Sequence, residues 1–125
     1  MHTSIVPLTL AASWLAFGCA ASLPVPTQHL AEAEAAERSA VELGAASHPD
    51  AQLHLTLARD QMTLANAAVK EGNNGRADAL AQRATSDAEL AIALTRDQSA
   101  KTGAQKAADQ SNAQTVTNMN QGATK

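Results

Sequence analysis

The chain has 125 residues, a formal net charge of −3 and an aromatic content of only 2%. Both aromatic residues, Trp14 and Phe17, lie near the N-terminus, whereas alanine supplies 30 positions. Aromatic side chains dominate most ligand pockets, and basic stripes with stacking platforms mark nucleic-acid binders, so this composition argues against a deep ligand cavity and against a nucleic-acid partner.

The first 18 residues have the layout of a secretory signal peptide that ends at the chain's single cysteine. An uncharged, largely apolar run leads into Cys19, and it is shorter than the roughly 20 apolar residues that a membrane-spanning helix needs. The segment resembles a bacterial lipobox, because Gly18 and Cys19 match its pattern, although Phe17 replaces a small residue and no Lys or Arg precedes the run. We expect residues 1–18 to be a lipoprotein signal peptide and Cys19 to be lipidated. The alternative is ordinary signal-peptide cleavage nearby.

Residues 19–28 follow as a tether in which two prolines favour extended backbone. A first helix is predicted over about 27–43, with Thr27 as its N-cap and Gly44 as its left-handed terminator. A Glu34–Arg38 pair is expected to support it. Its predicted inner face consists of Leu30, Ala33, Glu37, Ala40, Val41 and Gly44.

A second helix is predicted from the segment Ser47-His48-Pro49-Asp50 to about Lys70. Ser47 is the expected cap, Asp50 occupies the capping-box position, and Pro49 is tolerated in the first turn. The predicted buried face consists of Leu53, Leu57, Leu64, Ala65 and Ala68, widened by Leu55, Met62 and Val69.

The run Glu71-Gly72-Asn73-Asn74-Gly75 predicts a tight turn with an N-cap for a third helix, and so an antiparallel hairpin. This helix is expected from about 76 to at least 96 and at most to about 109. Residues 109–125 carry little apolar surface and are predicted to be a disordered polar tail. The narrow face of the third helix is predicted to be Leu80, Ala84, Ala88, Ala91 and Thr95, flanked by Ala77, Ala81, Asp87 and Leu94.

Several segments together resemble the bacterial envelope family defined by a domain of unknown function, DUF4398. They run from Ala31-Glu32-Ala33-Glu34-Ala35-Ala36 through His48-Pro49-Asp50, Leu57-Ala58-Arg59-Asp60 and Ala67-Ala68-Val69-Lys70-Glu71-Gly72 to Ala84-Thr85-Ser86-Asp87-Ala88-Glu89-Leu90-Ala91. The resemblance implies an outer-membrane or periplasmic location. It supplies no catalytic residues.

Candidate chemistry in the helices is sparse. Asp50 and His54 lie four residues apart, and His48 and His29 could approach them, so a metal site is a minor hypothesis. It lacks a recognised ligand motif, and Asp50 is better explained by the helix start. We therefore expect neither a metal site nor a cofactor.

A paired-carboxylate site is not indicated either, because Asp87 and Glu89 are two residues apart and point to different faces of a helix. No Ser, Thr or Cys lies in a nucleophile motif. The chain is expected not to be an enzyme.

The sequence therefore predicts an all-α fold, a small antiparallel helical hairpin or three-helix bundle at residues 29–108, between the tether and the tail. The expected function is that of a lipid-anchored helical interaction or spacer module at the periplasmic face of the outer membrane, near the cell wall. Helix faces of this kind can pack on a protein partner or on a second copy, as coiled coils do. The alternative is a soluble periplasmic binding or chaperone-like protein.

Overall fold

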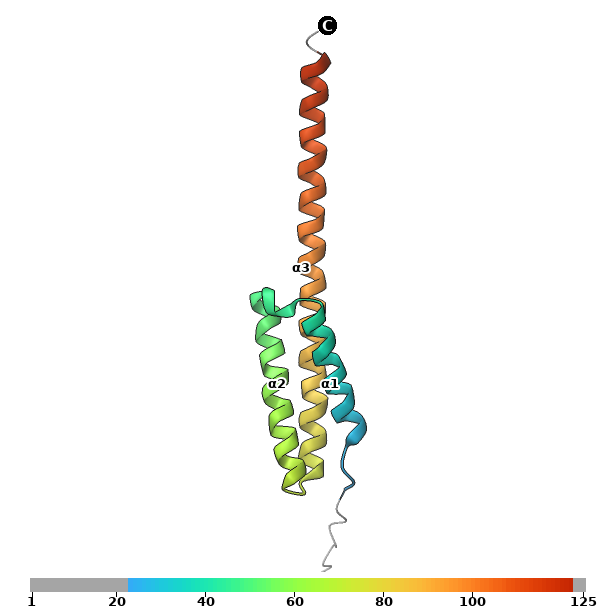
Figure 1. Cartoon of the computed structure of the whole chain (residues 1–125), viewed down its shortest axis with the longest axis vertical. Coiled ribbons are helices and arrows are strands. Elements are labelled where there is room, and N and C mark those ends of the chain that lie inside the picture. Colours follow the sequence, from blue (N-terminus) through green and yellow to red (C-terminus); the bar gives the residue numbers. More distant parts are fainter. Residues whose placement is uncertain (1–22, 123–125) are drawn as a thin grey trace, which may run out of the picture.

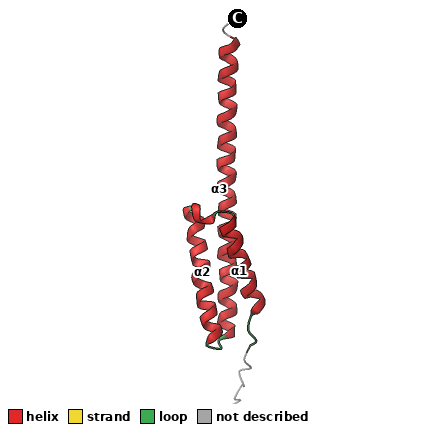
Figure 2. Cartoon of the chain, in the orientation of Figure 1, coloured by secondary structure: helices red, strands yellow, loops and turns green. Residues whose placement is uncertain are grey.

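A computed structural model describes residues 23–122, which fold into three α-helices and one short 3-10 helix (Figure 2). In chain order these are α1 (Thr27–Glu42), η1 (Ala45–Ser47), α2 (Pro49–Lys70) and α3 (Asn74–Gly122). No strand occurs within residues 23–122, and the predicted all-α fold is confirmed. Cys19 and the predicted signal peptide lie outside the described residues.

The three helices form a bundle in which α2 and α3 are antiparallel and α1 packs beside them, mainly on α3 (Figure 1). Gly72 has a φ of 74° in the turn between α2 and α3, and the Asn73 side chain accepts a hydrogen bond from the backbone N–H of Arg76. Gly44 has a φ of 86° at the end of α1. Both connections therefore use the turn chemistry that the sequence predicts.

Alanine dominates the interior of the bundle. Of the 16 residues that are buried in the described part of the chain, 12 are alanines, and the others are Leu55, Met62, Leu80 and Thr95. Small side chains let helix axes approach the lower end of the usual 8–10 Å range. Because each alanine buries little surface, the few large side chains supply a disproportionate share of the apolar burial.

The predicted inner faces of α1 and α3 are largely confirmed. All five residues of the predicted narrow face of α3 are buried, and on α1 Ala33 and Ala40 are buried. Val41 is an exception, because 45% of its surface is exposed. The expected Glu34–Arg38 pair is replaced by another, in which Arg59 of α2 donates to Glu37 over 2.7 Å.

The buried face of α2 differs from the predicted one. Three leucines expected in the core, Leu53, Leu57 and Leu64, are exposed by 58, 38 and 48% of their surface. Leu55, Met62, Ala65 and Ala68 of the predicted face are buried, and Ala51 and Ala58, which the prediction lacked, complete the interior. From Ala51 to Ala65 these residues alternate at spacings of four and three, which keeps them on one helix face against the similarly spaced alanines of α3.

The two predicted N-caps are also corrected. Pro26 takes the N-cap position of α1, and Thr27 is already helical. Ser47 lies in η1, so His48 precedes α2 and makes no side-chain capping bond. Pro49 is the first residue of α2, within the first turn that the sequence predicts for it, and its missing N–H has no intrahelical partner to lose there.

The third helix, α3, continues far beyond Thr95, its last buried residue. It has 49 residues, about 74 Å at 1.5 Å per residue, and it projects well beyond the bundle (Figure 1). Every residue from 96 to 121 is exposed. We call residues 96–122 the shaft.

The shaft overlaps the predicted disordered tail, residues 109–125, of which residues 109–122 are helical. The prediction weighed only apolar burial, whereas this segment lacks proline and extends an existing helix, which avoids the cost of nucleation. Residues 123–125 lie outside the described part. Although α3 is long enough to cross a bilayer, neither it nor any other described helix is apolar enough.

Candidate functional site

The residues considered for metal binding are separated by the fold. His54 of α2 faces Asp87 of α3, whereas His48 and Asp50 lie at the start of α2 and His29 contacts Asp78. Within residues 23–122 no three His, Cys, Asp or Glu side chains come close enough to share a metal ion. The residues of the minor metal-site hypothesis are therefore not brought together.

Asp87 is the centre of one polar cluster between α2 and α3. Its two carboxylate oxygens accept hydrogen bonds from His54 Nδ1 over 2.9 Å and from Gln61 Nε2 over 2.7 Å. Glu89 is exposed and takes no part in this cluster. Asp87 thus fixes the register of α2 on α3, and it does not pair with Glu89 for acid–base chemistry.

A second cluster joins the start of α1 to α3. His29 Nδ1 donates to Asp78, and Gln82 Nε2 donates to the other oxygen of that carboxylate over 2.9 Å. This hydrogen bond from His29 raises the pKa of His29 above its ordinary value of 6.5, against a smaller lowering by desolvation. The charges of Asp78 and Glu32 act in the same direction as the hydrogen bond. The contact holds α1 to the bundle most firmly when the imidazole is protonated.

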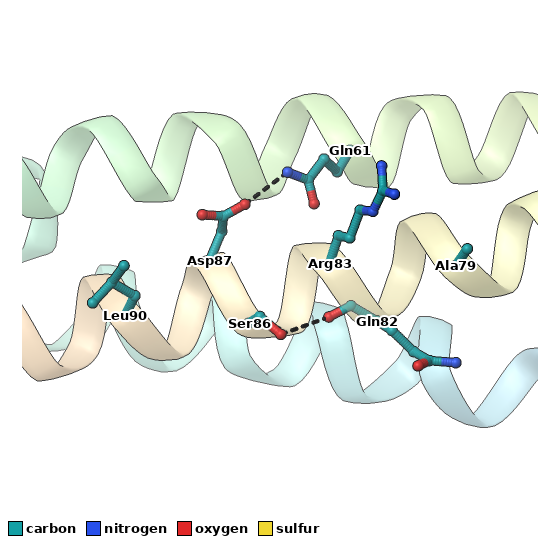
Figure 3. Close-up of a pocket in the computed structure, with 7 residues that line it drawn as sticks. All are labelled: Gln61, Ala79, Gln82, Arg83, Ser86, Asp87 and Leu90. Carbon is teal, nitrogen blue, oxygen red and sulfur yellow. Dashed lines mark hydrogen bonds between the residues drawn. The ribbon is translucent and has the colours of Figure 1, made fainter.

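An open groove of about 590 Å³ runs between α2 and α3 (Figure 3). It is lined by Gln61 from α2 and by Ala79, Gln82, Arg83, Ser86, Asp87 and Leu90 from α3. Arg83 extends toward α2 beside Gln61 (Figure 3), and the buried Oε1 of Gln61 has no hydrogen-bond partner among residues 23–122. Ser86 donates to the Gln82 carbonyl over 3.1 Å, so its hydroxyl is engaged by the backbone.

Beside this groove, α2 exposes a stripe of three leucines. We call Leu53, Leu57 and Leu64 the leucine ridge. Leu57 and Leu64 are four residues before and three residues after Gln61, so they share its side of α2. On α3, Leu90 is 42% exposed within the groove itself. Apolar side chains that the bundle leaves exposed therefore gather around one polar groove.

A smaller cavity, of about 340 Å³, lies where the shaft leaves the bundle. His48, Asp50, Asp97 and Lys101 contribute its polar lining, and Lys101 is paired with Asp97 over 2.7 Å. The hydrogen bond to Asp97 raises the pKa of Lys101 above its ordinary value of 10.5. The cavity thus contains an ion pair made by successive turns of α3.

Ser86 and Asp87 both line the groove, but the hydroxyl of Ser86 donates to the Gln82 carbonyl and the carboxylate of Asp87 accepts from His54 and Gln61. The hydroxyls of Thr56, Thr63, Thr85 and Thr95 each donate to the backbone carbonyl four residues earlier, as Ser86 does. The two histidine–aspartate pairs each join different helices of the bundle. What the described residues offer is a surface of helices with shallow grooves.

Sequence reasoning missed the groove residues and the exposure of the leucine ridge. The sequence does contain a signal for the exposure of the ridge. Spacings of four and three residues alternate without a break along one other face of α2, which consists of Ala51, Leu55, Ala58, Met62 and Ala65. Leu53, Leu57 and Leu64 are themselves four and seven residues apart, so they also fit one helix face and were predicted to be buried. The pairing of His29 with Asp78, 49 residues away, has no such local signal.

Fold and surface together define a small three-helix domain with one helix extended into a long exposed shaft. Residues 28–108 match the family described as Domain of unknown function (DUF4398), and the chain belongs to this family. The predicted resemblance is thereby confirmed. No curated protein and no solved structure matches the chain.

Proposed function

We propose that the chain is a lipid-anchored envelope protein whose helical domain serves as an interaction or spacer module in the periplasm and catalyses no reaction. The observation that carries this proposal is the shaft, in which every side chain from 96 to 121 is exposed. A helix held away from its own bundle presents surface to other molecules. It contributes little to a core or to a pocket.

The position of the N-terminal end supports an anchor at Cys19. The Asn74 side chain donates to the carbonyl of Leu23, which holds the chain beside the turn between α2 and α3. The shaft extends from the opposite end of the bundle (Figure 1). The seven residue steps from Cys19 to Pro26 span at most about 25 Å, so an anchored bundle would stay close to the membrane.

The residue after Cys19 bears on which membrane holds the anchor. It is Ala20, and not the aspartate that often retains bacterial lipoproteins in the inner membrane. The proposed location is therefore the periplasmic face of the outer membrane.

Metabolic labelling with a fatty-acid analogue tests the anchor. Cells expressing the full chain should yield a labelled product of processed size, and the Cys19→Ser variant should yield none, because serine offers no thiol for the lipid. Immunoblots of both variants control for expression. An unlabelled wild-type protein that is nonetheless exported would contradict the proposal.

That last outcome would support the alternative, a soluble periplasmic binding or chaperone-like protein released by ordinary signal-peptide cleavage. The leucine ridge is the observation that favours it, because exposed apolar stripes bind apolar segments of other proteins. Fractionation separates the two proposals, since the soluble form leaves the cell with the periplasmic contents while the lipidated form stays with the membranes.

A further inference from the structure

The outer side of α3 carries a second regular pattern, distinct from its buried face. Ten exposed positions alternate at spacings of four and three residues, the repeat of a coiled-coil seam. They are Ala79, Arg83, Ser86, Leu90, Ala93, Asp97, Ala100, Ala104, Ala107 and Ser111. We call this set the outer seam.

The outer seam joins the two exposed features of the molecule. Its first four positions, Ala79 to Leu90, line the groove between α2 and α3. Its last five positions, Asp97 to Ser111, are exposed on the shaft, where Asp97 alone lines the cavity at the start of α2. Covering one side of the shaft would bury surface that its own bundle leaves in water.

We infer that two copies of the chain pair through the outer seam in antiparallel orientation, so that the shaft of each copy lies along the groove of the other. The two-fold axis passes at Thr95, the last buried residue of α3. All ten positions then find a counterpart in the second copy. The five kinds of layer are Ala79 with Ser111, Arg83 with Ala107, Ser86 with Ala104, Leu90 with Ala100, and Ala93 with Asp97.

The residues in these layers favour the antiparallel orientation. Each layer contains at least one alanine, so the two charged positions and the single leucine all face a small side chain. A parallel pair in the same seam would place Arg83 against Arg83 and Asp97 against Asp97. Like charges brought together in this way destabilise a helix pair, and the antiparallel pair avoids both contacts.

Charges beside the seam are complementary in the same register. Asp87 directly follows Ser86, and Lys101 directly follows Ala100, so both flank the seam on the same side. They lie eight and six residues from Thr95, which brings Asp87 of one copy to within about 3 Å, along the helix axis, of the level of Lys101 of the second copy. The pair occurs twice because the arrangement is symmetric. Arg96 meets its own equivalent near the axis, where the adjacent Asp97 side chains offset the repulsion.

The contact is large enough for a specific interface. The outer seam extends over about 50 Å of helix, and a helix about 10 Å wide covers roughly 500 Å² on each copy. Both copies together bury about 1,000 Å² before any contact with α2, near the lower limit of specific interfaces. Leu57 and Leu64 of the leucine ridge flank the groove and would add apolar area against the shaft of the second copy.

This inference deepens the proposed interaction role but does not depend on the lipid anchor. Its test uses the full chain with the substitution Cys19→Ser, so that introduced cysteines are the only thiols. Ser86→Cys and Ala104→Cys, both at exposed positions, share one layer of the antiparallel pair. Mixing the two single variants and adding a short bismaleimide should yield a covalent dimer. Ala104→Cys alone should not dimerise, because the two copies of residue 104 would lie about 27 Å apart along the axis.

Two further variants keep the test independent of folding. Ala100→Glu places a charge in the Leu90 layer and should shift sedimentation equilibrium at least tenfold toward monomer. Ala113→Glu makes the same substitution on the opposite side of the shaft and should leave the equilibrium unchanged. Circular dichroism should show equal helix content in both variants at a concentration where both are monomeric.

Three results would overturn the inference. Efficient dimerisation of Ala104→Cys alone would mean a parallel pair. A monomeric wild type with no cross-link in the mixture would mean that no pair forms. Cross-linking of Ala104→Cys in intact cells to a different protein, without any self-linked dimer in the mixture, would assign the outer seam to another partner.

Discussion

Replacing Leu55 by alanine tests whether the face of α2 that carries Leu55 is the one packed inside the bundle. Leu55 is 1% exposed, and it is one of the two largest side chains that are fully buried. It packs in a cluster with Ala40, Ala45, Ala51 and Ala91, none of which can expand to fill the space that it leaves.

The expected cost combines the lost transfer free energy with that of the cavity, about 2–5 kcal/mol for a buried leucine. A single thin core in a domain of this size rarely supplies more than about 3–5 kcal/mol. Leu55→Ala should therefore remove most of the stability of the bundle. Leu57→Ala is the matched control, because Leu57 lies two residues away on α2 with 38% of its surface exposed, and it should cost less than about 1 kcal/mol.

Urea unfolding followed by far-UV circular dichroism measures both effects, since residues 23–122 contain no aromatic side chain for fluorescence. The shaft contributes a large share of the helical signal, so a variant in which the bundle alone unfolds should lose part of its ellipticity. Equal losses of stability for Leu55→Ala and Leu57→Ala would refute the described register of α2. So would a loss below about half a kcal/mol for Leu55→Ala.

Three other predictions follow from the packing, the charges and the backbone. Ala88→Leu, at a position with no exposed surface, should destabilise the bundle by about 1–3 kcal/mol in urea unfolding, whereas Ala67→Leu on the exposed side of α2 should be near neutral. The raised pKa of His29 means that its contribution to stability is fully present below pH 6.5 and is lost as the pH rises through the folded-state pKa. His29→Gln should therefore abolish that part of the pH dependence, and an unchanged pH profile would contradict the assignment. Gly103→Ala, in open space within the shaft, should stabilise the helix by about 0.5–1 kcal/mol, while Gly72→Ala, at a φ of 74°, should destabilise the turn, as paired thermal melts can show.

The extents of α1 and α2 and the turns between the helices were largely predictable because they follow from local chemistry, whereas the end of α3 was predicted too early. Gly44, Pro49 and Gly72 mark boundaries that the structure keeps, and the alanine spacing of α3 identifies its buried face. The face of α2 was predicted only in part, because Leu53, Leu57 and Leu64 also lie at helical spacings but are exposed. In a core made of alanines, the position that matches the partner helix is buried even when a larger side chain lies nearby.

The groove and the clusters around it could not be derived in the same way. Asp87 meets His54 and Gln61 only because α2 and α3 are antiparallel in one particular register. His29 reaches Asp78 only once α1 has packed on α3. Contacts of this kind depend on the tertiary arrangement, which periodicity alone does not specify.

The inferred pair also constrains how the chain could be held at a membrane. In an antiparallel pair the two Leu23 ends lie at opposite ends of a rod. Both tethers could reach the same membrane only if the rod lay along its surface. An unpaired chain could instead direct its shaft away from the membrane, so pairing would decide between the interaction role and the spacer role.

The measurement that tests the central proposal most directly is the intact mass of the processed protein isolated from the envelope. We predict a mature chain that begins at Cys19, with a mass that exceeds that of the bare polypeptide by its attached lipid. A mature chain that begins after Cys19, or that carries an unmodified thiol there, would contradict the proposed anchor.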